Sequence, residues 1–289
     1  AGAGTVSGVS FAGFEDLAGA AGNEDVFAFE AGGTISGTVE GGDGGYDTVE
    51  IAAGGAPLSS TITGPQSGTV GRGDDVIAYA GMEPVTITGT SAVVITAPAG
   101  ATVTIAESGT PSDRTFSISF DGAGETHVIT GADMVTSITV NLGAGANTVI
   151  IAALDPSFTG TLTIAGGAGD DTVTFLEKTG AGAYTFSGGS GNDTLAGPDL
   201  DNTWSVVGAG AGSLNGEIAF TGVENLTGGA AADRFAMLAG GSISAVIDGG
   251  AIDPAEVTLN TLDYSSRSAS MSVDLQALAA TNVGAFTRI

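Results

Sequence analysis

The residues best suited to chemistry in this sequence are acidic side chains in glycine-rich turns. The stretch "GGAGDDTV" at 166–173 returns as "GGSGNDTL" at 188–195, so Asp171 and Asp193 each end a G-G-x-G-x-D pattern. Carboxylates and turn carbonyls are oxygen ligands, and Ca²⁺ accepts about six to eight of them in flexible geometry, whereas Mg²⁺ requires a stricter octahedron. The pattern therefore predicts calcium rather than magnesium.

Four further residues join this candidate set because they lie in or beside similar turns. Asp170 and Asn192 precede the two aspartates, Asp75 ends a shorter G-x-G-x-D, and Asp47 lies in the looser "GGDGGYDTV" at 41–49. The candidate metal ligands are Asp171, Asp193, Asp75, Asp170, Asn192 and Asp47. A conformational interpretation stays open, because Asp and Asn also favour turns by bonding to nearby backbone and tolerating left-handed conformations.

The elements that must position these side chains follow from the spacing of the turns. Glycine-rich turns begin at positions 122, 143, 167, 189, 208, 229 and 250, so the spacing is nearly constant. Alternating runs such as "DTVTF" and "NTVII" follow most turns and predict β-strands. Coils stacked about 4.8 Å apart would align the turns in a column. We therefore predict an all-β parallel β-solenoid, β-helix or β-roll-like, with coils of about 19–24 residues and with Asp171 and Asp193 on adjacent coils.

A longer repeat lies over this short one. The segment "DVFAFEAGGTISGTVEGG" from residue 25 matches "DRFAMLAGGSISAVIDGG" from residue 233, with ten of 18 positions identical. Together with a second match just before it, residues 11–42 are repeated as 220–250, which defines a unit of about 209 residues. We expect residues 1–289 to form a single repetitive solenoid and to be an excerpt of a longer array.

Composition limits the possible partners. The 289 residues include 50 glycines and no cysteine, and the formal net charge is -26. Such an acidic chain argues against nucleic acid, whose phosphates require cationic contacts. No apolar run reaches the roughly 20 residues that a membrane-spanning helix needs. We therefore expect neither a nucleic-acid partner nor a membrane span.

The two G-G-x-G-x-D motifs resemble the haemolysin-type calcium-binding repeat, the glycine-rich nonapeptide of repeats-in-toxin proteins. The resemblance implies a β-roll, calcium-coupled folding outside the cell and the aspartate of each motif as a ligand. The chain departs from the uninterrupted tandem order of that family, and Asn147 or Thr126 replaces the acid in other turns.

The chain, including "VENLTGG" and "VIAYAGMEPVTITG", also resembles repeat regions of very large bacterial surface and adhesin-like proteins. That resemblance implies a stalk or surface-layer role without enzymatic activity.

Three other features suggest alternative functions. The single histidine, His127, has no cysteine or second histidine for a zinc site, so we predict a structural role. The "RGD" at 72–74 resembles an integrin-binding tripeptide but also forms one of the glycine turns. T-x-T patterns at 61, 86, 102, 161 and 172 resemble the threonine ladders of ice-binding proteins, yet they do not keep the coil interval.

We expect the chain to be a structural or adhesive extracellular module of a bacterial surface protein, stabilised by calcium. Its expected partners are copies of itself, stacked end to end or in tandem, with glycans or a cell surface as further candidates. A β-helical polysaccharide-active enzyme is one alternative, but no nucleophile and base are brought together in the sequence, so we predict no enzyme. An ice-binding or glycan-binding adhesin module is the other alternative.

Overall fold

The computed structural model describes residues 2–6, 9–110, 113–131, 135–152, 154–155, 157–177, 181–251 and 259–289. These residues form β-strands and no helix, which confirms the predicted all-β class for the part of the chain described. Accordingly, none of them belongs to a helix that is long and apolar enough to cross a membrane. The chain divides into two compact units, Ala1–Asn141 and Leu142–Ile289.

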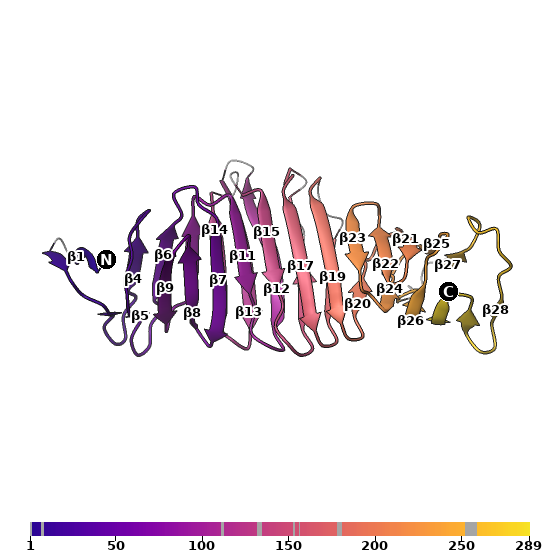
Figure 1. Cartoon of the computed structure of the whole chain (residues 1–289), viewed down its shortest axis with the longest axis horizontal. Helices are drawn as coiled ribbons and strands as arrows, with labels where there is room; N and C mark the ends of the chain where they lie inside the picture. The colour runs from indigo at the N-terminus through magenta and orange to yellow at the C-terminus, as the bar shows by residue number, and fades with distance from the viewer. Residues whose placement is uncertain are drawn as a thin grey trace. The chain divides into compact units, whose positions relative to one another are not determined.

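The first unit contains two sheets and a separate hairpin (Figure 1). One sheet has the spatial order β3 (Leu17–Ala18), β5 (Thr38–Glu40), β9 (Asp75–Ala80), β8 (Ser67–Arg72), β7 (Leu58–Gly64), β11 (Ala92–Thr96) and β15 (Ser137–Asn141). The other has the order β4 (Val26–Phe29), β6 (Thr48–Ala52), β10 (Val85–Thr88), β14 (Glu125–Thr130), β13 (Asp113–Asp121) and β12 (Thr102–Thr110). The hairpin joins β1 (Ala3–Val6) to β2 (Val9–Ala12).

The second unit also contains two sheets. One has the order β17 (Thr161–Ala168), β19 (Ala183–Ser190), β23 (Ile218–Thr221), β22 (Ala211–Leu214), β21 (Asn202–Gly208), β25 (Asp233–Met237) and β27 (Thr261–Asp263). The other has the order β16 (Thr148–Ile151), β18 (Thr172–Phe175), β20 (Thr194–Ala196), β24 (Asn225–Thr227), β26 (Ile243–Asp248), β30 (Val283–Thr287), β29 (Ala279–Ala280) and β28 (Val273–Asp274).

Parallel pairs between strands that are distant in sequence dominate both units. In the first unit Val26 lies opposite Thr48, and in the second Thr172 lies opposite Thr194, so both pairs join positions one short repeat apart. Side chains alternate along these strands, as in β18, where Val173 and Phe175 are buried between half-exposed threonines. Because paired strands keep the same phase, apolar side chains stack on apolar side chains from strand to strand.

Among the described residues three antiparallel triplets interrupt this regular interval, β7–β8–β9, β12–β13–β14 and β21–β22–β23, while a further triplet, β28–β29–β30, lies at the end of its sheet. Each of the three interrupting triplets adds two strands to one sheet before the chain continues in the other sheet, so Val85 lies opposite His127 rather than opposite a residue one coil length later. The predicted coil interval is therefore wrong where a triplet is inserted. The glycine turns at Gly73, Gly122 and Gly210 join antiparallel strands, and they are hairpin turns rather than corners between the two sheets.

A buried arginine ties segments of the first unit together. Arg72 is only 6% exposed, and its guanidinium donates hydrogen bonds to the carbonyls of Glu30, Gly33 and Ala52. The three acceptors lie at or just beyond the ends of strands β4 and β6, so one side chain fixes several loops. Since this is the arginine of the "RGD" tripeptide, its guanidinium is already engaged and is not presented to a receptor.

Replacing Arg72 with Met should destabilise the protein by about 2–4 kcal/mol, because three backbone carbonyls lose a charged donor. Urea unfolding followed by circular dichroism measures the change. Arg234 is the matched control, because it is half-exposed and paired with Asp263, and Arg234→Met should cost no more than about 1 kcal/mol. Equal effects of the two substitutions would contradict the role assigned to Arg72.

Candidate functional site

The second unit contains a column of acid and amide side chains that bind backbone amides. The Oδ1 atom of Asp193 accepts a hydrogen bond of 2.8 Å from the N–H of Asp171, and Oδ1 of Asp171 accepts one of 3.0 Å from the N–H of Asn147. The N–H of Asp193 in turn donates to Oε2 of Glu224 at 2.9 Å. We call Asn147, Asp171, Asp193 and Glu224 the acid–amide column. Each acid of the column accepts a hydrogen bond from the backbone N–H of the residue before it in the column.

The same contact occurs elsewhere in both units. The N–H of Asp25 donates to Oδ1 of Asp47 at 2.7 Å in the first unit, and the N–H of Asp233 donates to Oδ1 of Asn260 at 2.8 Å in the second. An amide oxygen therefore makes the contact as well as a carboxylate oxygen does. Neither a negative charge nor a bound cation is required for it.

The other predicted ligands have different surroundings. Asp170 and Asn192 are exposed beside the acid–amide column, where Oδ1 of Asp170 accepts the N–H of Asn192 at 2.8 Å. Asp75 lies opposite Arg72 in the hairpin of β8 and β9 and makes no part of a column. The structure thus brings together Asp170, Asp171, Asn192 and Asp193, and it places Asp47 and Asp75 in separate elements of the first unit.

The first glycine of each motif makes room for the second carboxylate oxygen. The Oδ2 atoms of Asp171 and Asp193 are buried and have no hydrogen-bond partner among the described residues. A Cβ atom on Gly166 would lie 2.6 Å from Oδ2 of Asp171, and one on Gly188 would lie 2.5 Å from Oδ2 of Asp193. Such contacts are too short for any larger side chain, so the spacing of glycine and aspartate has a steric reason.

Burial sets the electrostatics of these acids. It raises the pKa of Asp171, although hydrogen bonds from Asn147 act in the opposite direction. Burial likewise raises the pKa of Asp193, and the charges of Asp171 and Glu224 add to the effect. For Asp233, burial raises the pKa to about 6. Ionised carboxylates are therefore costly in these columns, and an amide at the same place avoids that cost.

Calcium at the acid–amide column would have to bind the second oxygens of Asp171 and Asp193, since their first oxygens accept backbone amides. Asp171 and Asp193 are 0% exposed, each has one oxygen bound to a backbone amide, and the other oxygen packs against glycine. Within the described ranges no group of three or more His, Cys, Asp or Glu side chains is arranged to hold a metal ion. Calcium takes about six to eight oxygens, which include turn carbonyls as well as carboxylates, so calcium at these turns stays a prediction from the repeats.

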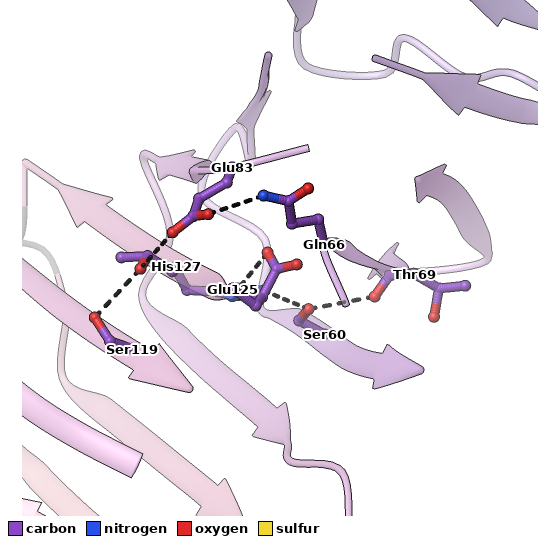
Figure 2. A network of polar contacts seen from close by, with 8 residues as sticks. Ser60, Gln66, Thr69, Glu83, Ser119, Glu125 and His127 are labelled. Atoms are coloured by element: carbon purple, nitrogen blue, oxygen red, sulfur yellow. Dashed lines mark hydrogen bonds and ion pairs between the residues drawn. The ribbon is translucent and has the colours of Figure 1, made fainter. Parts of the chain in front are cut away.

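A second group of polar side chains lies in the core of the first unit (Figure 2). Oγ of Ser60 lies 2.7 Å from Nε2 of His127, and Nδ1 of His127 lies 3.7 Å from Oε1 of Glu125. Tyr79 is also buried, and its burial, together with the charge of Glu125, raises its pKa. We call Ser60, Tyr79, Glu125 and His127 the core polar cluster.

The strands bring these residues together through their alternation. Glu125 and His127 are two positions apart on β14, whose pattern of buried and half-buried positions turns both inward. Ser60 comes from β7 and Tyr79 from β9. Gly68 on β8 leaves room for the tyrosine, because a Cβ atom there would lie 2.6 Å from the Tyr79 hydroxyl oxygen.

Burial keeps the core polar cluster uncharged near neutral pH. It raises the pKa of Glu125 to about 8, a rise that the charge of Glu83 increases and the hydroxyl of Tyr79 opposes. It lowers the pKa of His127 to about 3 and raises that of Tyr79. A neutral imidazole therefore lies beside a carboxyl group that is mostly protonated at pH 7.

The order serine, histidine and glutamate resembles a nucleophile, a base and the acid that orients the base. Catalysis would require a substrate to reach the serine, yet Ser60 is 1% exposed and His127 is 0% exposed. A protonated Glu125 also does not stabilise an imidazolium ion. The position of His127 suits the structural role that the sequence predicts, and its partners Ser60 and Glu125 were not foreseen. Their only signal is a polar residue at an inward position of an alternating strand.

Glu83 connects the core polar cluster to more exposed side chains (Figure 2). Its Oε2 accepts a hydrogen bond of 3.1 Å from the Gln66 amide, and its Oε1 accepts one of 3.5 Å from the Thr126 hydroxyl. Thr126 also contacts the Ser119 hydroxyl at 3.3 Å. This half-buried acid is the charge that faces Glu125 from the loop between β9 and β10.

Comparison of the chain with models of protein families, with curated proteins and with solved structures found no match.

The glycine of the second motif gives the first prediction for the acid–amide column. Gly188→Ala places a Cβ atom 2.1 Å from the Gly222 carbonyl oxygen as well as against Asp193, so we expect a loss of about 1–3 kcal/mol or more. Gly208→Ala is the control, because its nearest atom would be 3.6 Å away and its effect should stay within about 0.5 kcal/mol. Thermal unfolding of both variants measures the difference, and equal melting temperatures would refute the steric reason.

Removal of divalent cations is the second test. We expect EDTA to leave the melting temperature unchanged, and Asp193→Asn to preserve it or raise it, because an amide oxygen still accepts the N–H of Asp171. Asp193→Leu, which offers no acceptor, should lower it. A fall in EDTA that calcium reverses better than magnesium would contradict this assignment and support the calcium site predicted from the repeats.

The pH dependence of stability tests the core polar cluster. Between about pH 4.5 and 8 the folded protein keeps a proton on Glu125 that the unfolded chain releases, so stability falls as pH rises. Between about pH 3 and 6.5 the unfolded chain binds a proton on His127 that the folded protein excludes, so stability rises with pH. The two effects oppose each other from about pH 4.5 to 6.5, and Glu125 acts alone above that range.

Glu125→Gln should therefore flatten the decline in melting temperature between pH 6.5 and 8. The exposed Glu50→Gln on β6 should leave the decline as it is in the original protein. If the melting temperatures of the original protein and Glu125→Gln change in parallel with pH, Glu125 is not protonated in the folded protein between pH 6.5 and 8.

Proposed function

We propose that the chain is a parallel β-solenoid and serves as a structural module of an extracellular bacterial surface protein. The observation that carries the proposal is the repeated contact in which Asp or Asn binds the backbone amide of the equivalent turn, at sequence separations of 22 and 24 residues. A contact that repeats along parallel strands allows layers to be added without a new kind of interface. In such a module the stacked backbone itself performs the structural role.

The charge of the chain supports this role. A net charge of -26 favours solubility and opposes sideways association, and it disfavours anionic membranes and nucleic acids. The parallel strands provide length, and the columns link successive turns through their backbone amides. Calcium binding and adhesion, which the family resemblances imply, stay predictions.

Ice binding is disfavoured by the threonine pattern itself. Thr148, Thr172 and Thr194 lie in register on β16, β18 and β20. The second column of the same strands contains Ile150, Thr174 and Ala196, so the array is one threonine wide. A flat ice-binding surface would require both columns.

Small-angle X-ray scattering tests the structural proposal. A solenoid should scatter as a rod, with a radius of gyration well above the roughly 19 Å expected of a compact domain of this length. Incubation with acidic and neutral polysaccharides should yield neither new reducing ends nor unsaturated sugars. A compact scattering profile would contradict the solenoid, and sugar cleavage would replace the structural function with an enzymatic one.

A further inference from the structure

The two copies of the long repeat have the same local structure. Leu17 pairs with Val39 in the first copy, and Leu226 pairs with Ile247 in the second. The N–H of Asp25 binds Asp47, as the N–H of Asp233 binds Asn260. The first strand of each copy therefore has an equivalent pairing, and the second strand also pairs in parallel with a later one, Val26 with Thr48 and Arg234 with Thr261.

The two copies differ in whether preceding strands of the chain pair with their first two strands. In the second copy β24 is covered by β20, which places Leu195 beside Leu226, and β25 is covered by β21, which places Trp204 beside Phe235. The Trp204 and Phe235 rings stack with centroids 5.6 Å apart. In the first copy β3 and β4 are the last strands of their sheets in the described part of the first unit, and the β1–β2 hairpin beyond β4 in Figure 1 forms a separate sheet.

Burial shows the consequence for equivalent side chains. Leu226 and Phe235 are 0% exposed and Asp233 is 1% exposed. Their counterparts Leu17, Phe27 and Asp25 are only partly buried, and the neighbouring Val26 is 62% exposed. An apolar strand edge is thus left open in one copy and covered in the other.

The hydrogen bonds differ in the same way. In the second copy the Asn202 amide donates to Oδ1 of Asp233 at 2.7 Å, from the covering strand β21. In the first copy Oδ1 of Asp25 accepts from Asn23, two positions earlier, also at 2.7 Å. A local residue takes the place that a covering strand occupies in the other copy.

We propose that the edge formed by β3 and β4 is the face by which successive units of this sequence join. Its occupant is the β20–β21 segment of another copy of this chain placed upstream, with Leu195 on Leu17, Trp204 on Phe27 and the Asn202 amide on Asp25. Exposed strand edges accept added strands through backbone hydrogen bonds, and side chains select the partner. This inference rests on the proposed structural function and names the partner of that module.

A tandem fusion tests the joining face. Residues 1–219 are fused directly to residues 11–289, so Phe11 of the second copy takes the place of Phe220. Thr203→Cys in the first copy and Val26→Cys in the second then occupy the positions of the parallel pair Thr203 and Arg234. The chain has no native cysteine. Parallel neighbours lie about 4.8 Å apart, which is within the range of a disulfide.

The single chain with Thr203→Cys and Arg234→Cys is the matched control. Under mild oxidation we expect the fusion to form its disulfide to within about two-fold of this control, as measured by peptide mass spectrometry. A fusion with Glu30→Cys in place of Val26→Cys should form at least about ten-fold less, because that residue lies outside the pairing. Trp204→Ala in the first copy should reduce the correct disulfide several-fold.

Each outcome decides between the two proposals. A disulfide in the control but not in the fusion overturns the joining face and leaves the solenoid standing. Equal disulfide formation by Val26→Cys and Glu30→Cys would show that the edge is mobile or adhesive and pairs in no fixed register. That result also overturns the joining face. Failure of the control contradicts the pairing of β21 with β25, and the structural proposal fails with it.

Discussion

The structure depends on one interaction: a side-chain oxygen of Asp or Asn accepts the backbone N–H of the equivalent residue in a neighbouring turn. Turns at the edge of a sheet leave amides that the strand ladders do not satisfy, and a buried amide without a partner is costly. Asp193 supplies the partner for Asp171, and Asp171 supplies it for Asn147. The acid is then buried, and glycine at Gly166 or Gly188 is the only residue that leaves space for its second oxygen.

The same balance of burial and hydrogen bonding governs the core polar cluster. Its groups avoid the cost of buried charge by staying neutral, because the pKa of Glu125 is raised to about 8 and that of His127 is lowered to about 3. Arg72 instead donates hydrogen bonds to three backbone carbonyls. Burial of a polar group is thus balanced by bonds to the backbone at Arg72 and by neutralisation at Glu125 and His127.

Periodicity predicted much of the fold from the sequence. The alternation in "DTVTF" and the regular return of G-G-x-G-x-D correctly gave parallel strands and brought Asp171 beside Asp193. The antiparallel triplets were missed because hairpin turns and corners between sheets use the same glycine-rich sequences, as at Gly122 and Gly210. Ser60 and Glu125 were missed because a contact between residues on β7 and β14 leaves no local pattern.

Hydrogen exchange at the Asp171 amide, resolved by NMR in the presence of EDTA, tests the central interaction most directly. We predict strong protection in the original protein and in Asp193→Asn, and loss of protection in Asp193→Ala, since only alanine removes the acceptor oxygen. Loss of protection in the original protein when EDTA is added, or unchanged protection in Asp193→Ala, would contradict it.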